Sequence, residues 1–192
     1  MNPRDDRIAF ECTKCGACCR EDSLLVTVTG RDISRISMGL NLDSSGVIRA
    51  LDFYLSAGIE TPDGLRDYPA VNTEKGPAYV ALKKLENGDC VFLKDNLCMI
   101  HAIRPAACMS FPFVFSNSED STFWGLSALK QICPGLGSGP QVRGSELKEL
   151  AITILEHLDI YNEFAKEWNH EEENPTAAGL VEKILSDPRF IV

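Results

Sequence analysis

Long apolar runs and clusters of basic residues are both missing from this 192-residue sequence. No run of about 18 apolar residues occurs, so no membrane-spanning helix is predicted, and the N-terminal MNPRDDRIAFEC lacks the apolar core of a secretory signal. Lys and Arg number 19 against 28 Asp and Glu, which gives a net charge of −9. Because nucleic-acid binding needs clustered positive charge, we expect no nucleic-acid partner. Because the apolar runs are missing, we also expect no membrane partner and a cytoplasmic location.

Signatures of common catalytic sites are also missing. The sequence contains no HExxH motif, no recognisable Ser, His and Asp set, and no glycine-rich loop of the kind that follows a strand and holds a nucleotide-like cofactor. Hydrolytic catalysis therefore has no positive support. The sequence assigns no catalytic residue and leaves open whether the protein is an enzyme.

Cysteine is the residue type that stands out. Four of the eight cysteines lie in FECTKCGACCR, residues 10–20, and four are isolated. Reducing conditions disfavour disulfides, and adjacent Cys18 and Cys19 could pair only through a strained ring. A thioredoxin-like dithiol needs one CxxC and leaves six cysteines unexplained. We interpret the cysteines as thiolate ligands of a metal centre. They are Cys12, Cys15, Cys18, Cys19, Cys90, Cys98, Cys108 and Cys133.

The spacing of these cysteines bears on the metal. Structural zinc sites usually take two CxxC-like pairs, whereas CxxCxxC with a remote fourth cysteine is typical of 4Fe-4S sites, and Cys133-Pro134 is similar to the end of ferredoxin motifs. Eight thiolates divide into two sites of four. We expect one or two 4Fe-4S clusters that serve electron transfer or a redox or modification reaction, with a protein partner. The alternative is a zinc-stabilised interaction module without catalysis.

Three further residues are candidates for contacts around the metal. His101 follows Cys98 by three positions and is either a ligand, a donor to a sulfur or part of the wall. Three roles are open for Arg104 and for Arg20: each could offset thiolate charge, hold a substrate carboxylate or form an ordinary ion pair. His157 and His170 are expected to be solvent-exposed.

Apolar periodicity predicts an α+β fold with short antiparallel strands and a C-terminal helical hairpin. Helices are expected at 31–40 and 44–57, a strand at 23–29, and hairpins across Asn87-Gly88 and across 117–121. The Gly- and Pro-rich segment 135–144 predicts a boundary. Residues 1–140 would form the cysteine-cluster metal-binding domain, and residues 141–192 a helical extension that begins near Ser145 and packs on it.

The cysteine pattern as a whole resembles the YkgJ-type CxxCxxCC family of zinc- or iron-chelating domains. The resemblance rests on FECTKCGACCR, CVFL, CMIHAIRPAACMSFP and a late Cys133, over about residues 10–135. It implies metal chelation. A flagellin lysine N-methylase carries a similar cluster, but methylase activity is not carried over, because no cofactor-binding glycine loop is present.

Overall fold

The computed structural model describes residues 8–57, 68–118 and 121–191. It has an α+β architecture with short antiparallel strands and two C-terminal helices, as predicted. The helices are α1 (Ala17–Arg20), α2 (Gly30–Leu40), α3 (Ser44–Ile48), η2 (His101–Ile103, a 3₁₀ turn), α4 (Ala106–Ser110), α5 (Gly144–Glu171) and α6 (Ala177–Ser186). The strands are β1 (Ala9–Phe10), β2 (Leu51–Leu55), β3 (Val71–Thr73), β4 (Gly76–Leu82), β5 (Leu93–Lys94), β6 (Leu97–Cys98), β7 (Phe113–Ser118), β8 (Ser121–Leu126) and β9 (Leu136–Gln141).

The largest sheet has the antiparallel order β2-β4-β3. Its central strand β4 is buried from Ala78 to Leu82. The prediction of one helix over 44–57 was wrong: α3 ends at Ile48, and β2 pairs Leu51 with Leu82 along the length of β4. Aromatic and aliphatic residues in LDFYL gain more from pairing with this buried strand than from continuing the helix.

Two other local predictions need correction. Residues 23–29 form a single bridge, Thr27 to Ala81, and not a full strand. Asn87-Gly88 does form a turn, but only Lys84 and Cys90 pair across it, and β5 pairs instead with β6. The hairpin across 117–121 is confirmed, since β7 and β8 pair from Phe113–Leu126 to Ser118–Ser121.

Helix α2 begins with a capping box. Thr29 Oγ1 accepts from the Asp32 amide, and the Asp32 carboxylate accepts from the Thr29 amide over 3.0 Å. The helix buries Ile33 and Ile36 in the main core. The sequence prediction of a helix at 31–40 is confirmed.

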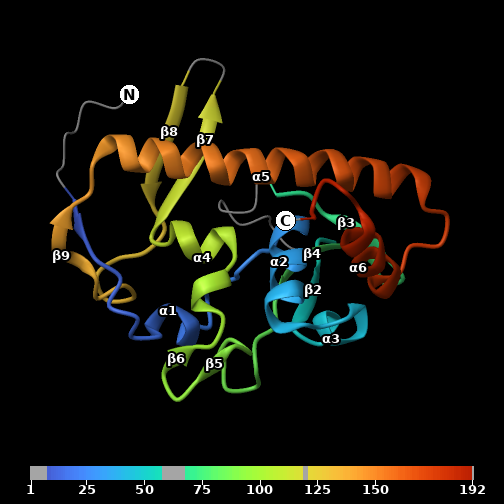
Figure 1. Cartoon of the computed structure of the whole chain (residues 1–192), viewed down its shortest axis with the longest axis horizontal. Coiled ribbons are helices and arrows are strands. Elements are labelled where there is room, and N and C mark those ends of the chain that lie inside the picture. The colour runs from blue at the N-terminus through green and yellow to red at the C-terminus, as the bar shows by residue number, and fades with distance from the viewer. Residues whose placement is uncertain (1–7, 58–67, 119–120, 192) are drawn as a thin grey trace.

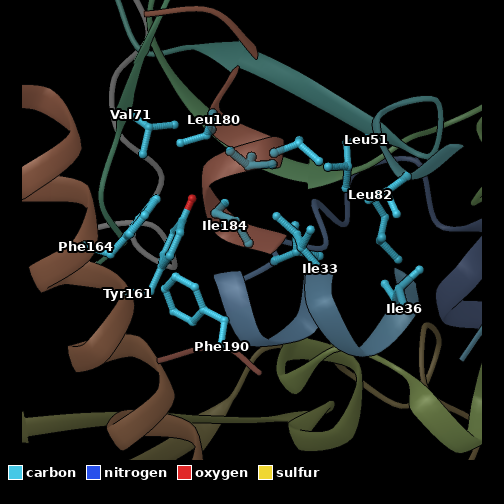
Figure 2. Packing of buried hydrophobic residues seen from close by; sticks show 14 of the residues in the cluster. Ile33, Ile36, Leu51, Val71, Leu82, Tyr161, Phe164, Leu180, Ile184 and Phe190 are labelled. Carbon is cyan, nitrogen blue, oxygen red and sulfur yellow. The ribbon is translucent and has the colours of Figure 1, made fainter. Parts of the chain in front are cut away.

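The main core joins α2 and the large sheet to α5 and α6. Figure 2 shows Tyr161 and Phe164 of α5 beside Phe190, with Ile184 of α6 next to Ile33 and Leu180 of α6 near Val71. The Phe164 and Phe190 rings lie 5.2 Å apart edge to face. Residues on both sides of position 140 therefore share one core, while the boundary between two domains at 140 stays a prediction.

Helix α5 runs the length of the molecule, with the large sheet, α2, α3 and α6 at one end and α1, α4, β1 and β9 towards the other (Figure 1). The Gly- and Pro-rich segment predicted as a boundary forms β9 and pairs with β1. No helix in the described residues is long and apolar enough to cross a membrane.

Candidate metal centre

Five separate segments bring cysteines to one region. Cys12 and Cys15 lie in the loop after β1, and Cys18 and Cys19 lie in α1. Strand β6 supplies Cys98, α4 supplies Cys108, and Cys133 precedes β9. The pairing of β1 with β9, extended by a 3.3 Å hydrogen bond from the Glu11 amide to the Gly135 carbonyl, joins the first segment to the last.

These cysteines line one cavity of about 240 Å³. The rest of its wall is mainly apolar and includes Phe10, Leu97, Phe111 and Ile132. All eight cysteines of the chain are free thiols. Seven of them line the cavity: Cys12, Cys15, Cys18, Cys19, Cys98, Cys108 and Cys133. The structure thus places most of the predicted ligands together.

Cys90 is the predicted ligand outside the cavity lining, and its thiol is near enough to Cys98 and Cys18 to interact with them electrostatically. Its side chain is buried in the main core and does not line the cavity. Its amide donates to the Cys19 carbonyl over 2.8 Å, so the Cys90 backbone helps to hold α1 in place. Burial raises the pKa of the Cys90 thiol.

Three of the cavity thiols interact directly. A hydrogen bond from the Cys19 thiol lowers the pKa of Cys18 to about 7, against an opposing effect of burial. The same Cys19 proton, shared with the Cys98 sulfur, lowers the pKa of Cys98 to about 6. The pKa of Cys19 rises because its single thiol proton is held between the Cys18 and Cys98 sulfurs. Two of these three sulfurs therefore favour the thiolate, the form that binds metals.

Cys108 and Cys15 differ in their surroundings. Burial raises the pKa of Cys108 well above its ordinary value. Cys15 is exposed, and a hydrogen bond from the Thr13 side chain, followed by one from the Ala17 amide, lowers the pKa of its thiol. The candidate ligands thus include an exposed sulfur, that of Cys15, and a buried one, that of Cys108.

The turn between Cys15 and Cys18 requires glycine. Gly16 has φ 70°, and a Cβ there would lie 2.9 Å from the Asn96 carbonyl oxygen. Only glycine combines this left-handed conformation with so close an approach. This conformation gives the chain its tight turn within the cysteine motif.

The three predicted neighbours of the centre take two different roles. His101 and Arg104 line the cavity, and Arg104 Nη1 donates to His101 Nε2 over 2.7 Å. Partial burial, then the charges of Arg104 and Lys14, lower the pKa of His101. Arg20 does not line the cavity, and instead holds the Asn96 side chain and the Cys15 carbonyl at 2.7 and 2.8 Å.

Two residues of α2 hold the site against the main core. Asp32 Oδ1 accepts from the Ala106 amide over 3.0 Å, and Arg35 Nη2 donates to the Arg104 carbonyl over 2.6 Å. Sequence reasoning missed both contacts. The spacing from Thr29 to Asp32 predicts a capping box at the start of α2, but nothing local points to the burial of Asp32 or to its contact with Ala106.

Free thiols, an apolar wall and nearby positive charge fit a thiolate-bound metal centre. In residues 8–57, 68–118 and 121–191, no three Cys, His, Asp or Glu side chains are gathered closely enough to hold a single ion. The cysteines are distributed around the cavity wall.

The fold and the cavity define an α+β protein with a cysteine-lined centre. The CxxCxxCC family model, described as "Putative zinc- or iron-chelating domain", matches residues 11–134, and the chain belongs to this family. An uncharacterized protein of Methanocaldococcus jannaschii is 29% identical over 132 residues, which are 57% of this chain and 47% of that protein. The chain therefore spans about half the length of this relative. No solved structure matches the chain.

Proposed function

We propose that the seven cavity cysteines hold an iron-sulfur centre, of one or two 4Fe-4S clusters, and that Cys90 is not a ligand. The observation that carries this proposal is the number of thiols on one cavity. A tetrahedral zinc ion uses four ligands. Seven thiols around a volume of about 240 Å³ favour a centre with several metal atoms.

The surroundings of the cavity support a redox role. Apolar residues such as Phe111 and Ile132 limit access of water to bound metal, and exposure to water is one of the factors that set cluster potential. Cys12 and Cys15 are exposed and lie at the outer side of the motif. A cluster bound by Cys12 and Cys15 would be within reach of a protein partner for electron transfer or for a redox-dependent modification.

Spectroscopy on anaerobically prepared protein tests this proposal. The full-length chain, reconstituted with iron and sulfide, should bind about four to eight iron atoms and absorb broadly at about 400 nm. Reduction should bleach this absorption and produce an EPR signal. A redox titration then shows whether the centre cycles reversibly.

The zinc alternative gives the opposite result in the same preparation. Colourless protein that retains one or two zinc ions, and excludes iron during anaerobic reconstitution, would overturn the iron-sulfur proposal while leaving thiolate chelation intact. Cys108→Ala serves as the control, because its loss of metal shows that the signal comes from the cavity and not from adventitious iron.

A further inference from the structure

Exposed apolar side chains gather beside the cysteine-lined cavity. Leu97 and Met99, on either side of Cys98, are 60% and 61% exposed, and Leu129 is 70% exposed. Leu129 lies in the turn before Cys133, whose amide donates to the Leu129 carbonyl over 2.9 Å, and both Cys98 and Cys133 line the cavity. Within the described part of the chain, no large apolar side chain is more exposed than Leu129, and only one outside this group is as exposed as Leu97. Exposed apolar residues that gather around one feature are typical of an interaction site.

The β5–β6 hairpin turns two of these side chains outwards. Lys94 pairs with Leu97, and Leu93 pairs with Cys98. Paired residues share a face and successive residues alternate between faces, so Lys94 and Leu97 lie on the face opposite to Cys98. By the same alternation, Met99 follows Leu97. Because Leu97 also lines the cavity, this outer face borders it.

The segments around the cavity form a rim that carries exposed positive charge. The rim consists of residues 12–20, 93–99 and 129–134, each of which contributes to the cavity wall. Figure 1 shows α1 of the first segment next to β5 and β6 of the second, where Arg20 donates to Asn96 over 2.7 Å. The basic residues of the rim are all exposed: Lys14, Arg20, Lys94 and Lys130. The one acidic residue within these segments is Asp95, although the whole chain has a net charge of −9.

Two acidic residues border the first segment of the rim, and both contact other parts of the chain. The Glu11 side chain lies against Gly139 of β9, where a Cβ would be 2.9 Å from Glu11 Oε2. The Glu21 carboxylate accepts from the Ser23 hydroxyl over 2.5 Å. Metal ions, when bound, offset part of the thiolate charge inside the cavity. The exposed lysines therefore dominate the charge that a partner meets at the rim.

An apolar surface bordered by positive charge fits an acidic protein. Protein interfaces combine an apolar centre with a polar border, and opposite charges on the two partners speed encounter and fix orientation. A nucleic acid is held mainly through its phosphates and gains little from Leu97, Met99 and Leu129. An anionic membrane is a broad surface that would also meet the acidic remainder of this chain. The rim therefore favours a protein.

We propose that the rim is the docking surface for an acidic protein that exchanges electrons with the metal centre. The three exposed apolar residues lie in the contact, and the rim lysines face carboxylates of the partner. One electron passes between the redox group of the partner and the metal centre, so one is oxidised as the other is reduced and no covalent bond changes. A surface of this size suits electron-transfer complexes, which have small interfaces. This inference rests on the proposed function, since it gives the chemistry of the partner for the same site.

Binding of redox proteins of known charge to the iron-loaded full-length protein tests the inference. The probes are fluorescently labelled plant-type ferredoxin and flavodoxin, which are acidic, and cytochrome c, which is basic. Fluorescence anisotropy at low ionic strength should show saturable binding of at least one acidic probe. Added salt should weaken this binding, because it screens exposed charges. Cytochrome c serves as the basic counterpart, and changes at the rim should not lower its affinity.

Two rim residues that do not line the cavity provide the variants. Lys94→Glu should weaken binding of the acidic probe by at least about tenfold, because it replaces attraction with repulsion. Leu129→Ser should weaken it severalfold, because the apolar contact is lost. The matched controls are Lys166→Glu, at an exposed lysine of α5, and Ile191→Ser, at a residue that is 60% exposed. Both controls should keep the affinity of the wild type.

Three results would overturn the inference. The first is that neither acidic probe binds, and the second is that both rim variants bind it as tightly as the wild type. The third is that the rim takes another occupant: phosphatidylserine vesicles, a DNA oligonucleotide or a second copy of this chain, detected by sedimentation, binds in its place and is lost in Leu129→Ser. Weaker binding of the acidic probe in both rim variants, with unchanged controls, supports the inference.

Iron content and the visible spectrum of each variant separate this inference from the proposed function. Loss of probe affinity in Lys94→Glu with iron content intact shows that the rim acts in docking and not in holding the metal. If the wild type holds no iron, the proposed function fails, and the same titrations on the metal-free protein still decide whether the rim binds an acidic protein.

Discussion

The Asp32 carboxylate accepts a hydrogen bond from the Ala106 amide over 3.0 Å and thereby joins the main core to the cysteine-lined cavity. Asp32 is 1% exposed, and the same oxygen forms a 2.8 Å salt bridge with Arg35. Arg35 in turn donates to the Arg104 carbonyl. One carboxylate in the first turn of α2 therefore supports the backbone that leads to Cys108.

Replacing Asp32 with asparagine should destabilise the protein and reduce its metal content. The amide removes the negative charge that pairs with Arg35, and a broken buried ion pair costs about 3 kcal/mol of unfolding free energy. Urea denaturation measures this cost. The control is Arg143→Gln, which removes an exposed salt bridge of 3.9 Å and should change stability by less than about 0.5 kcal/mol. Equal stabilities of the two variants would contradict the stabilising role of the ion pair between Asp32 and Arg35.

His157 should make stability depend on pH. Its ring is buried, and Nε2 accepts a hydrogen bond from Arg31 over 3.2 Å, which places the proton on Nδ1, an atom without a partner. Burial, then the Arg31 charge, lower the pKa of His157 below the ordinary 6.5. The neutral form is favoured in the folded state, so this contribution to stability is complete above pH 6.5 and is lost as pH falls towards the lowered pKa.

Urea denaturation between pH 5 and pH 8 checks the His157 prediction. The wild type should lose stability below about pH 6.5, and His157→Gln should flatten this part of the profile. His170→Gln is the matched control, because His170 is exposed on the same helix. An unchanged slope in His157→Gln would show that other groups cause the pH dependence.

Phe190 should be among the most costly residues to truncate. Its ring is 1% exposed and packs edge to face against Phe164 and Tyr161. It also fills the space beside Gly30, where a Cβ would lie 2.6 Å from the ring. Phe190→Ala should lower the unfolding free energy by about 3–5 kcal/mol. Ile191→Ala, at an exposed neighbour, should stay near the wild type in the same urea experiment.

Local patterns were enough to predict several elements and failed where distant segments decide the structure. The helix at 31–40 and the β7–β8 hairpin follow from periodicity and turn residues within each segment. The core role of Phe190 was not predicted, because it depends on α2 and α5. His157 was expected to be exposed and is buried, although its spacing to Tyr161, Phe164 and Trp168 places it on the buried face of α5.

The same distinction applies to the candidate site. The local motif identified Cys12 to Cys19 as a group, and the family resemblance extended it to the isolated cysteines. Spacing alone does not separate Cys90 from Cys98, because their positions depend on how the chain folds between β4 and β6. Cys90 follows the turn at Gly88 and enters the core, whereas Cys98 lies in β6 at the cavity wall.

The two cysteines Cys90 and Cys108 therefore provide a direct test of the ligand set. Cys108→Ala removes a sulfur that lines the cavity and should lower the iron bound per chain and the absorption at about 400 nm. Cys90→Ala removes a core sulfur, should cost about 1 kcal/mol of stability, and should keep the iron content of the wild type, because its amide still holds the Cys19 carbonyl. Iron analysis after anaerobic reconstitution checks both. If Cys90→Ala loses as much iron as Cys108→Ala, the centre uses all eight thiols and the seven-cysteine assignment is wrong.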